Sequence, residues 1–424
     1  MCALLLASVG IANAQTPHLY VTGSTAYRNP VEHALLAQFD AGVVYGYDGG
    51  SFGGQHDTIY SGTIGGTAWI IATSWSGSEA GIQTVSGGGS IPFLNDNQIA
   101  SCTTSGNGAL RNVTGDTTAQ SDSVFSPADM AMSDTLQSAS EFQGLFHSVT
   151  YPTLTEATNS PVGINVFKFI ANKGSSLTGV TSQQIRKLYA AGKLPLAFFT
   201  GNNADETSTV YVTGRNPDSG TRVTALLESG TGTALTSVVQ YQPFHSGAGL
   251  QGSGVVDALN PYPAGTVNGI SISTGNNGYS SGGNLVKSLN SDFTNGGSSL
   301  GVTVGSSHYN TTPSNGHSLS MIGYASSNDA DGQIALGVVE LSYNGVKVGV
   351  STDYNTNTLL TEGQYTFWSK EHVYPGLSED ASHLTLINAI ASTIPNQAGA
   401  VKISNMKVTR AADGGVVSAG YSVF

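Results

Sequence analysis

Short apolar runs of strand length alternate with segments of helical periodicity along most of this chain. The runs are "HLYVTG" (18–23), "AWIIATS" (68–74), "VGINVFKFIAN" (162–172), "STVYVTG" (208–214) and "MIGYAS" (321–326). Each is bounded by Gly, Ser, Thr or Asn, and most are followed by an amphipathic stretch. A strand-then-helix order of this kind predicts an α/β fold whose sheets are covered by helices on both faces.

The helical segments carry recognisable start and stop signals. Residues 29–39 begin with Asn29, the expected N-cap. Residues 181–193 contain Thr181 and Gln184 at capping-box spacing and end at a glycine. The last such segment, residues 382–395, has a predicted apolar stripe made of Leu384, Ile387, Ile390 and Ile394.

Glycine-rich stretches interrupt this alternation. The chain has 424 residues, of which 55 are Gly, and 39% are hydrophobic, which is enough for a sizeable core split over two lobes. Residues 45–66, 86–123 and 246–317 are rich in Gly, Ser and Thr without a fixed period. We expect them to be Gly/Ser-rich loop insertions and hairpins on the surface, and we reject a repeat architecture.

The N-terminal segment "MCALLLASVGIANAQT" indicates export. Its apolar run ends in Ala12-Asn13-Ala14, an A-x-A pattern, so residues 1–14 are expected to be a signal peptide cleaved before Gln15. A membrane span is the alternative, but it needs about 20 apolar residues. We expect a soluble protein of the periplasm or the extracellular space, and the low charged fraction of 10% suits that location.

Charge and residue usage exclude several classes of function. The net charge of −12 leaves no basic stripe for nucleic acid. The histidines show no metal-binding spacing, and Cys102 has no cysteine partner once the signal peptide is removed, so we expect no metal, no cofactor and no internal disulfide. We found no catalytic triad spacing and expect the protein not to be an enzyme.

The segment "GRNPDSGTR" (214–222) has the parts of an oxyanion site. Arg215 supplies a guanidinium fork, Ser219 is a capping hydroxyl, and Gly220 and Thr221 open a predicted helix. The first N–H groups of a helix have no internal partner and favour an anion. Arginine adds paired, charge-assisted hydrogen bonds. A plain N-cap with an exposed arginine is the alternative interpretation of this segment alone.

Further segments repeat the pattern at other strand ends. Ser24, Thr25 and Ala26 follow the first strand, and Ser78 follows "AWIIATS" in the turn "WSGSEAGI" (75–82). Asp134 ends "MAMSDT". A carboxylate can accept the proton that phosphate still carries at neutral pH, whereas it would repel sulfate, so Asp134 favours a protonated oxyanion. A helix cap or turn is the alternative role for Asp134.

In this order, the segments resemble the phosphate-binding proteins that serve bacterial ABC transporters. The resemblance rests on "GST" after the first strand, "GSEAGI", "SD" and "RxxxSGT", and on the landmarks "LTGVTSQQIRKLYAAGK", "MIGYAS" and "EGQYTFWSKEHVYP". It implies a periplasmic-binding-protein fold (type II-like) of two α/β lobes joined by a double crossover, with the ligand between the lobes. It implies lobe I over 15–162 and 337–424 and lobe II over 163–336.

The ligand contacts that the resemblance implies come from both lobes. They are Thr25, Ser78, Asp134, Arg215, Ser219, Gly220 and Thr221, with Ser24 and Ala26 one register step away. Glu79 departs from the family pattern, and it would oppose an anion unless it turns outward or pairs with Arg215 or Arg28.

The leading hypothesis is an exported receptor that captures inorganic phosphate, or a similar tetrahedral oxyanion, and delivers it to an ABC permease in the inner membrane. We expect this receptor to be a monomer. The alternative is an extracellular structural or surface-assembly protein that keeps the binding-protein fold and self-associates through its insertions. The scarcity of charged residues and the Gly/Ser-rich stretches favour that alternative.

Overall fold

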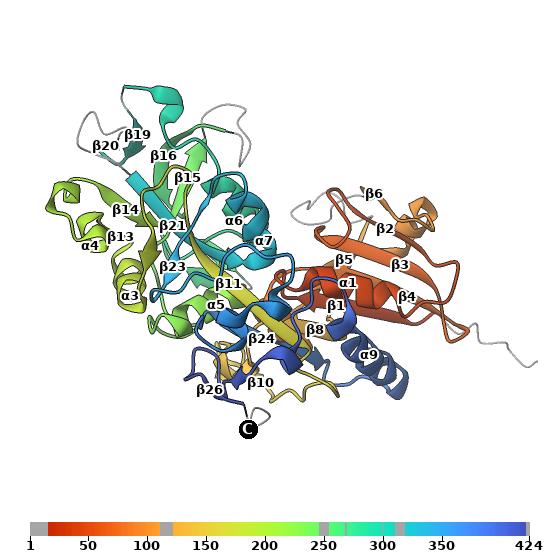
Figure 1. The fold of residues 1–424 in the computed structure, drawn as a ribbon. Helices are drawn as coiled ribbons and strands as arrows, with labels where there is room; N and C mark the ends of the chain where they lie inside the picture. The colour runs from red at the N-terminus through yellow and green to blue at the C-terminus, as the bar shows by residue number, and fades with distance from the viewer. Residues whose placement is uncertain are drawn as a thin grey trace, which may run out of the picture.

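A sheet of twelve strands runs through the whole molecule in the computed structural model, which describes residues 16–110, 122–245, 254–267, 269–299, 301–309 and 319–420 (Figure 1). The strand order is β13 (Lys193–Pro195), β14 (Thr209–Val212), β21 (Leu319–Ser326), β11 (Gly163–Ala171), β24 (Trp368–Pro375), β8 (Met130–Ser133), β1 (His18–Gly23), β4 (Thr67–Ser74), β3 (Asp57–Ile64), β2 (Val44–Asp48) and β6 (Asn107–Leu110), with β22 (Val339–Glu340) also paired to β11. The expected signal peptide, residues 1–14, lies outside the described residues.

Two strands carry the chain between the lobes. Residues 163–166 of β11 pair with β24, and residues 167–171 of the same strand pair with β21. In turn, β24 pairs with β11 through residues 368–371 and with β8 through residues 372–375. Figure 1 shows both strands passing from one lobe to the other. The two-lobe α/β fold with a double crossover, expected from the sequence, is confirmed.

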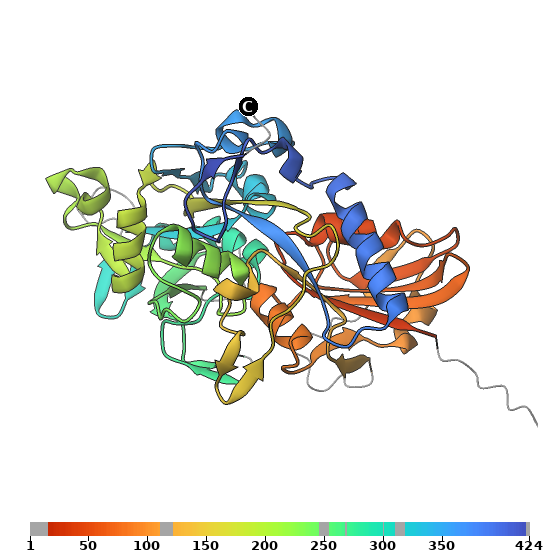
Figure 2. The same cartoon turned by 90° about the horizontal axis from the view of Figure 1, so that it is seen from below.

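Helices cover both faces of each half of the sheet. In lobe I, α1 (Arg28–Leu36) and α9 (Ala381–Thr393) pack on one face and α2 (Ser78–Val85) packs on the other. In lobe II, α3 (Ser182–Ala191) and α5 (Gly220–Glu228) face α6 (Gly282–Leu289) and α7 (Ser327–Ile334) across the sheet. Figure 2 shows α9, which comes late in the chain, lying along lobe I. The short helices are α4 (Ala197–Thr200) and α8 (Thr358–Thr361).

Smaller sheets of two or four strands lie outside the central sheet. Lobe II carries a four-stranded sheet of β15 (Tyr241–His245), β16 (Val256–Pro261), β19 (Val302–Val304) and β20 (Ser307–Tyr309). The two-stranded sheets are β5 (Ile91–Leu94) with β7 (Ser123–Ser126), β9 (Gly144–Phe146) with β10 (Val149–Tyr151), β12 (Gly179–Val180) with β23 (Ser342–Tyr343), β17 (Gly265–Val267) with β18 (Ile270–Ile272), and β25 (Val408–Thr409) with β26 (Ser418–Ala419).

The local helix signals were only partly right. The Thr181 hydroxyl accepts from the Gln184 amide at 3.2 Å, and the Gln184 side chain accepts from the Thr181 amide at 2.8 Å, so the capping box is confirmed. The N-cap expected at Asn29 was wrong, because α1 begins at Arg28. Leu384 was also misplaced: it is 38% exposed, at the edge of the apolar stripe, and Leu386 is buried in its stead.

Residues 45–66 were expected to be loop insertions and hairpins on the surface, and the surface placement was wrong. This range contains most of β2 and all of β3, which extend the central sheet of lobe I and bury Ile59 and Tyr60. Within residues 246–317, helix α6 packs against β21 and is part of the lobe II core. Glycine lowers strand and helix propensity, but pairing with a neighbouring strand outweighs propensity.

The lobe boundaries expected from the sequence stay a prediction. The segment after residue 337 pairs with lobe II through β22, and its side chains Leu341, Tyr343 and Leu360 belong to the same hydrophobic cluster as α3 and α5. This packing favours a return to lobe I only at β24, later than the boundary at 336/337.

We predict that Lys168 of β11 is essential for stability. Its side chain is fully buried, with Nζ 2.6 Å from Asp331 Oδ1 and 3.6 Å from Glu340 Oε1. Lys168→Met would leave two acidic groups without their cation, which typically costs about 3–5 kcal/mol. Urea unfolding measures this loss.

A matched control is Lys407→Met. Lys407 lies 2.7 Å from Glu362, but both side chains are largely exposed. The loss there should stay below about 1 kcal/mol. Equal losses in the two variants would contradict the assignment of Lys168.

Candidate functional site

The residues singled out from the sequence gather where strand-to-helix corners of the two lobes meet. The corner from β1 to α1 carries Thr25, the corner from β4 to α2 carries Ser78, and β8 ends at Asp134. From lobe II, the corner from β14 to α5 carries Arg215 and Thr221. All these side chains are at least nine-tenths buried.

Asp134 bridges the two lobes. Ser78 of lobe I donates its hydroxyl to Asp134 Oδ1 at 2.5 Å, and Thr221 of lobe II donates to Oδ2 at 3.0 Å. A Cβ on Gly220 would lie 1.7 Å from Asp134 Oδ1, so only glycine lets the start of α5 approach this closely. Burial raises the pKa of Asp134, while the hydrogen bonds from Ser78 and Thr221 and the charge of Arg215 lower it.

Arg215 reaches across the junction in the opposite direction. Its Nη2 donates to the Thr25 hydroxyl of lobe I at 3.3 Å and to the Ser280 carbonyl at 2.9 Å, and its Nε donates to the Tyr279 carbonyl at 3.0 Å. The two carbonyls hold the guanidinium in place. Burial lowers the pKa of the Arg215 guanidinium, while the charges of Asp329 and, to a smaller extent, Asp134 act on it and raise its pKa.

Three expected residues border this arrangement in other roles. The Ser219 hydroxyl accepts from the Arg222 amide at 3.3 Å and caps α5, as predicted. The Ala26 carbonyl accepts from the Asn328 side chain at 3.2 Å, another contact between the lobes. The Ser24 side chain is buried and faces Glu371.

Glu79 turns away from the guanidinium. Its side chain is fully buried between α2 and the loop that follows β8. There it accepts hydrogen bonds from the Ser140 hydroxyl at 2.6 Å, the Glu141 amide at 3.3 Å and the Thr135 hydroxyl at 3.3 Å. Burial raises its pKa to about 8. Of the alternatives considered for Glu79, the structure therefore has it facing away from Arg215 within lobe I.

Sequence reasoning missed several groups at this junction. The stretch "GNNGYSSGGN" (275–284), expected to be a surface insertion, supplies the carbonyls that orient Arg215. A Cβ on Gly282 would lie 2.2 Å from Asp329 Oδ2 and 3.4 Å from Arg215 Nη1. The double glycine that opens α6 was the available signal, because such close approach demands residues without a side chain.

A cavity of about 280 Å³ adjoins the site on the side of Thr25. It is lined also by Arg28, Phe52 and Asp329, among others, and lies between the loop before β3 and the start of α7.

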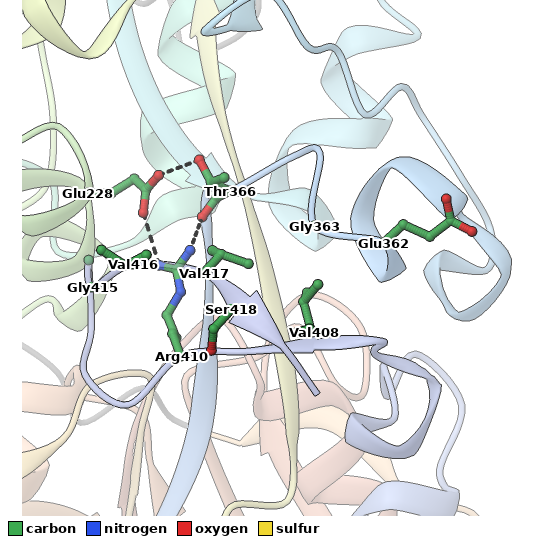
Figure 3. A pocket seen from close by; sticks show the side chains of 12 residues that line it. Glu228, Glu362, Gly363, Thr366, Val408, Arg410, Gly415, Val416, Val417 and Ser418 are labelled. Atoms are coloured by element: carbon green, nitrogen blue, oxygen red, sulfur yellow. Dashed lines mark hydrogen bonds and ion pairs between the residues drawn. The ribbon is translucent and has the colours of Figure 1, made fainter. Parts of the chain in front are cut away.

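A larger cavity of about 560 Å³ lies elsewhere, beneath the β25–β26 hairpin (Figure 3). At its base Arg410 Nη1 donates to Glu228 Oε2 at 2.9 Å, and Thr366 donates to Glu228 Oε1 at 2.5 Å. The ion pair satisfies these charges internally, and the cavity shares no residue with the junction that holds Asp134 and Arg215.

Within the described ranges, no group of three or more His, Cys, Asp or Glu side chains is placed to hold a metal ion. The described helices also include none that is both long and apolar enough to cross a membrane.

Comparisons with known proteins find likeness only among solved structures. No protein-family model matches the chain, and no curated protein sequence matches it. A protein from Clostridium perfringens assigned as a phosphate ABC transporter substrate-binding protein, solved with bound phosphate, is 13% identical with a TM-score of 0.42, covering 91% of this chain and 99% of its own. An ABC-type phosphate transport receptor from Vibrio cholerae is 12% identical with a TM-score of 0.41, covering 90% of this chain and 99% of its own.

We predict that Glu79 makes stability depend on pH. A carboxyl whose pKa rises from 4.5 to about 8 on folding keeps a proton that the unfolded chain releases. The free energy of unfolding therefore falls as the pH rises through this window. Glu79→Gln should reduce the loss of stability between pH 5.5 and pH 8.5 by about 2–4 kcal/mol.

Urea unfolding at the two pH values tests this, with Glu206→Gln as an exposed control that should leave the pH dependence of the wild type unchanged. An unaltered pH dependence in Glu79→Gln would rule out the buried, protonated state of Glu79.

Proposed function

We propose that this protein is an exported solute-binding protein that captures inorganic phosphate, or a similar tetrahedral oxyanion, between its lobes and delivers it to an ABC permease in the inner membrane. The observation that supports it most is the exchange of contacts across the junction. Arg215 of lobe II meets Thr25 of lobe I, and Asp134 of lobe I meets Thr221 of lobe II. The anion would contact both lobes only when they are closed.

The chemistry of the site suits a protonated anion. The guanidinium of Arg215, the hydroxyls of Thr25, Ser78 and Thr221, and the N-terminus of α5 are donors for oxygen atoms. Asp134 is the one acceptor among them, and it would take the hydrogen bond of the proton that phosphate carries. The binding needs no covalent step, and closure about the crossover strands would follow from contacts made only in the closed form.

A second candidate is a structural or surface-assembly role that keeps the fold. The direct bonds between Asp134, Ser78 and Thr221, and between Arg215 and Thr25, favour it, because these groups also satisfy one another within the protein. In that role the contacts fasten the lobes together. It predicts no heat of binding with phosphate, and self-association that is visible in size-exclusion chromatography.

We predict that Arg215→Ala weakens phosphate binding by roughly 30- to 150-fold. Loss of a charge-assisted fork costs about 2–3 kcal/mol. Isothermal titration with phosphate measures the change. Arg186→Ala, an exposed arginine on α3, is the matched control and should bind as the wild type does.

Wild-type protein without saturable heat would overturn the transport receptor and favour the structural role. Unchanged affinity in Arg215→Ala would remove Arg215 from the site while leaving binding in place.

We predict that Asp134→Asn changes selectivity between anions. The carboxylate repels an anion that has no proton to donate, whereas an amide can donate to it. The ratio of phosphate affinity to sulfate affinity should therefore fall by roughly tenfold or more. Competition titrations measure it, with Asp205→Asn on the lobe II surface as control, and an unchanged ratio would contradict this role.

A further inference from the structure

Glu371 lies on the crossover strand β24, under the anion site. It is fully buried and pairs with Gly163 of β11, while the next residue, His372, pairs with Ser133 of β8. Ser133 directly precedes Asp134. Glu371 therefore occupies the point at which β24 passes from one lobe to the other, one strand away from the carboxylate of the proposed site.

The groups around Glu371 come from each element packed against it. Asn165 of β11 donates its side-chain amide to Glu371 Oε2. From the corner between β1 and α1, the Ser24 hydroxyl and Tyr27 lie beside it, and Asp134 approaches from the end of β8. Its neighbour His372 points to the other face of the strand and binds Glu156 at 3.0 Å.

No cation compensates this carboxyl: among the residues that the structure describes, Glu371 makes no ion pair. A buried carboxylate without a cation is costly, and two carboxyls close together do not ionise independently. Burial and the charge of Asp134 raise the pKa of Glu371 well above its usual range, although Asn165 and Ser24 lower it. Glu371 and Asp134 are thus two neighbouring buried acidic groups, and of these two only Asp134 interacts with the guanidinium of Arg215, which Asp329 also faces.

We propose that Glu371 is a specificity-determining residue that makes the site favour the oxyanion in its less negative, more protonated form. The inference rests on the proposed function. While Glu371 holds its proton it is neutral and adds no repulsion. When it ionises, its charge joins that of Asp134 beside Ser24 and Thr25, and the anion is bound less tightly. Asp134 would accept a hydrogen bond from the ligand's proton by direct contact. Glu371 would not touch the ligand and would change its affinity only through electrostatic repulsion.

The test compares the pH profile of phosphate binding in wild type and in Glu371→Gln, by isothermal titration from pH 6 to pH 8.5. Titration of phosphate itself is common to both proteins, so the ratio of their dissociation constants isolates Glu371. The two should bind equally while Glu371 is protonated, and wild type should become weaker than the variant, by roughly five- to tenfold, as Glu371 loses its proton with rising pH. One proton limits the slope to tenfold per pH unit.

A second measurement counts protons. Titration in buffers of different ionisation enthalpy gives the number of protons taken up on binding at pH 8, which should be larger for wild type than for Glu371→Gln. Glu371→Asp, which keeps an acid at this position, should retain the pH dependence. It also serves if the glutamine variant is poorly folded.

The matched control is Glu32→Gln. Glu32 is also fully buried, but the hydroxyls of Thr58 and Thr73 and the indole of Trp75 bind it within lobe I. The phosphate dissociation constant of Glu32→Gln should change with pH in the same way as that of the wild type. A constant ratio between wild type and Glu371→Gln, with equal proton uptake, would overturn the role of Glu371 alone. Absence of phosphate binding by wild type at every pH would overturn the proposed function together with it.

Discussion

The antiparallel pairing of β11 with β24 is the constraint on which the rest of the structure depends. Each strand begins its pairing in one lobe and completes it in the other, so their register sets how the lobes face each other. Because β24 also pairs with β8, the same register positions Asp134 opposite the start of α5. A slip of one residue would turn every side chain of β24 to the other face of the sheet, and Glu371 would turn away from Asn165.

The interlobe junction buries several acidic side chains and few cationic ones, and this imbalance decides which anions it could accept. Arg215 is fixed by two carbonyls, while Asp134 and Glu371 are buried carboxyls whose pKa values are both raised by burial. Such a site binds an anion only if the anion brings a proton or if the carboxyls keep theirs. The preference that we propose for a protonated oxyanion, and its sensitivity to pH, follow from this single arrangement.

The sequence predicted the contact groups better than their surroundings. Ser219 as a cap and Gly220 as a close approach could be anticipated, because both depend on local helix geometry. The carbonyls of Tyr279 and Ser280 could not, because they lie in a glycine-rich stretch without periodicity and reach Arg215 only through the fold. The position of Glu371 next to Asp134 could not be predicted either, because nothing local distinguishes this residue within "WSKEHVYP".

By itself the sequence determined the alternation of strands and helices and the set of hydroxyls, glycine, carboxylate and guanidinium at strand ends. These properties depend on spacings within a few residues. Only the tertiary structure decided that residues 45–66 extend the sheet, that Glu79 faces the interior of lobe I and that Glu371 lies beneath Asp134. Those outcomes depend on which distant segments pair and which polar groups find partners, and such contacts are set by packing rather than by local propensity.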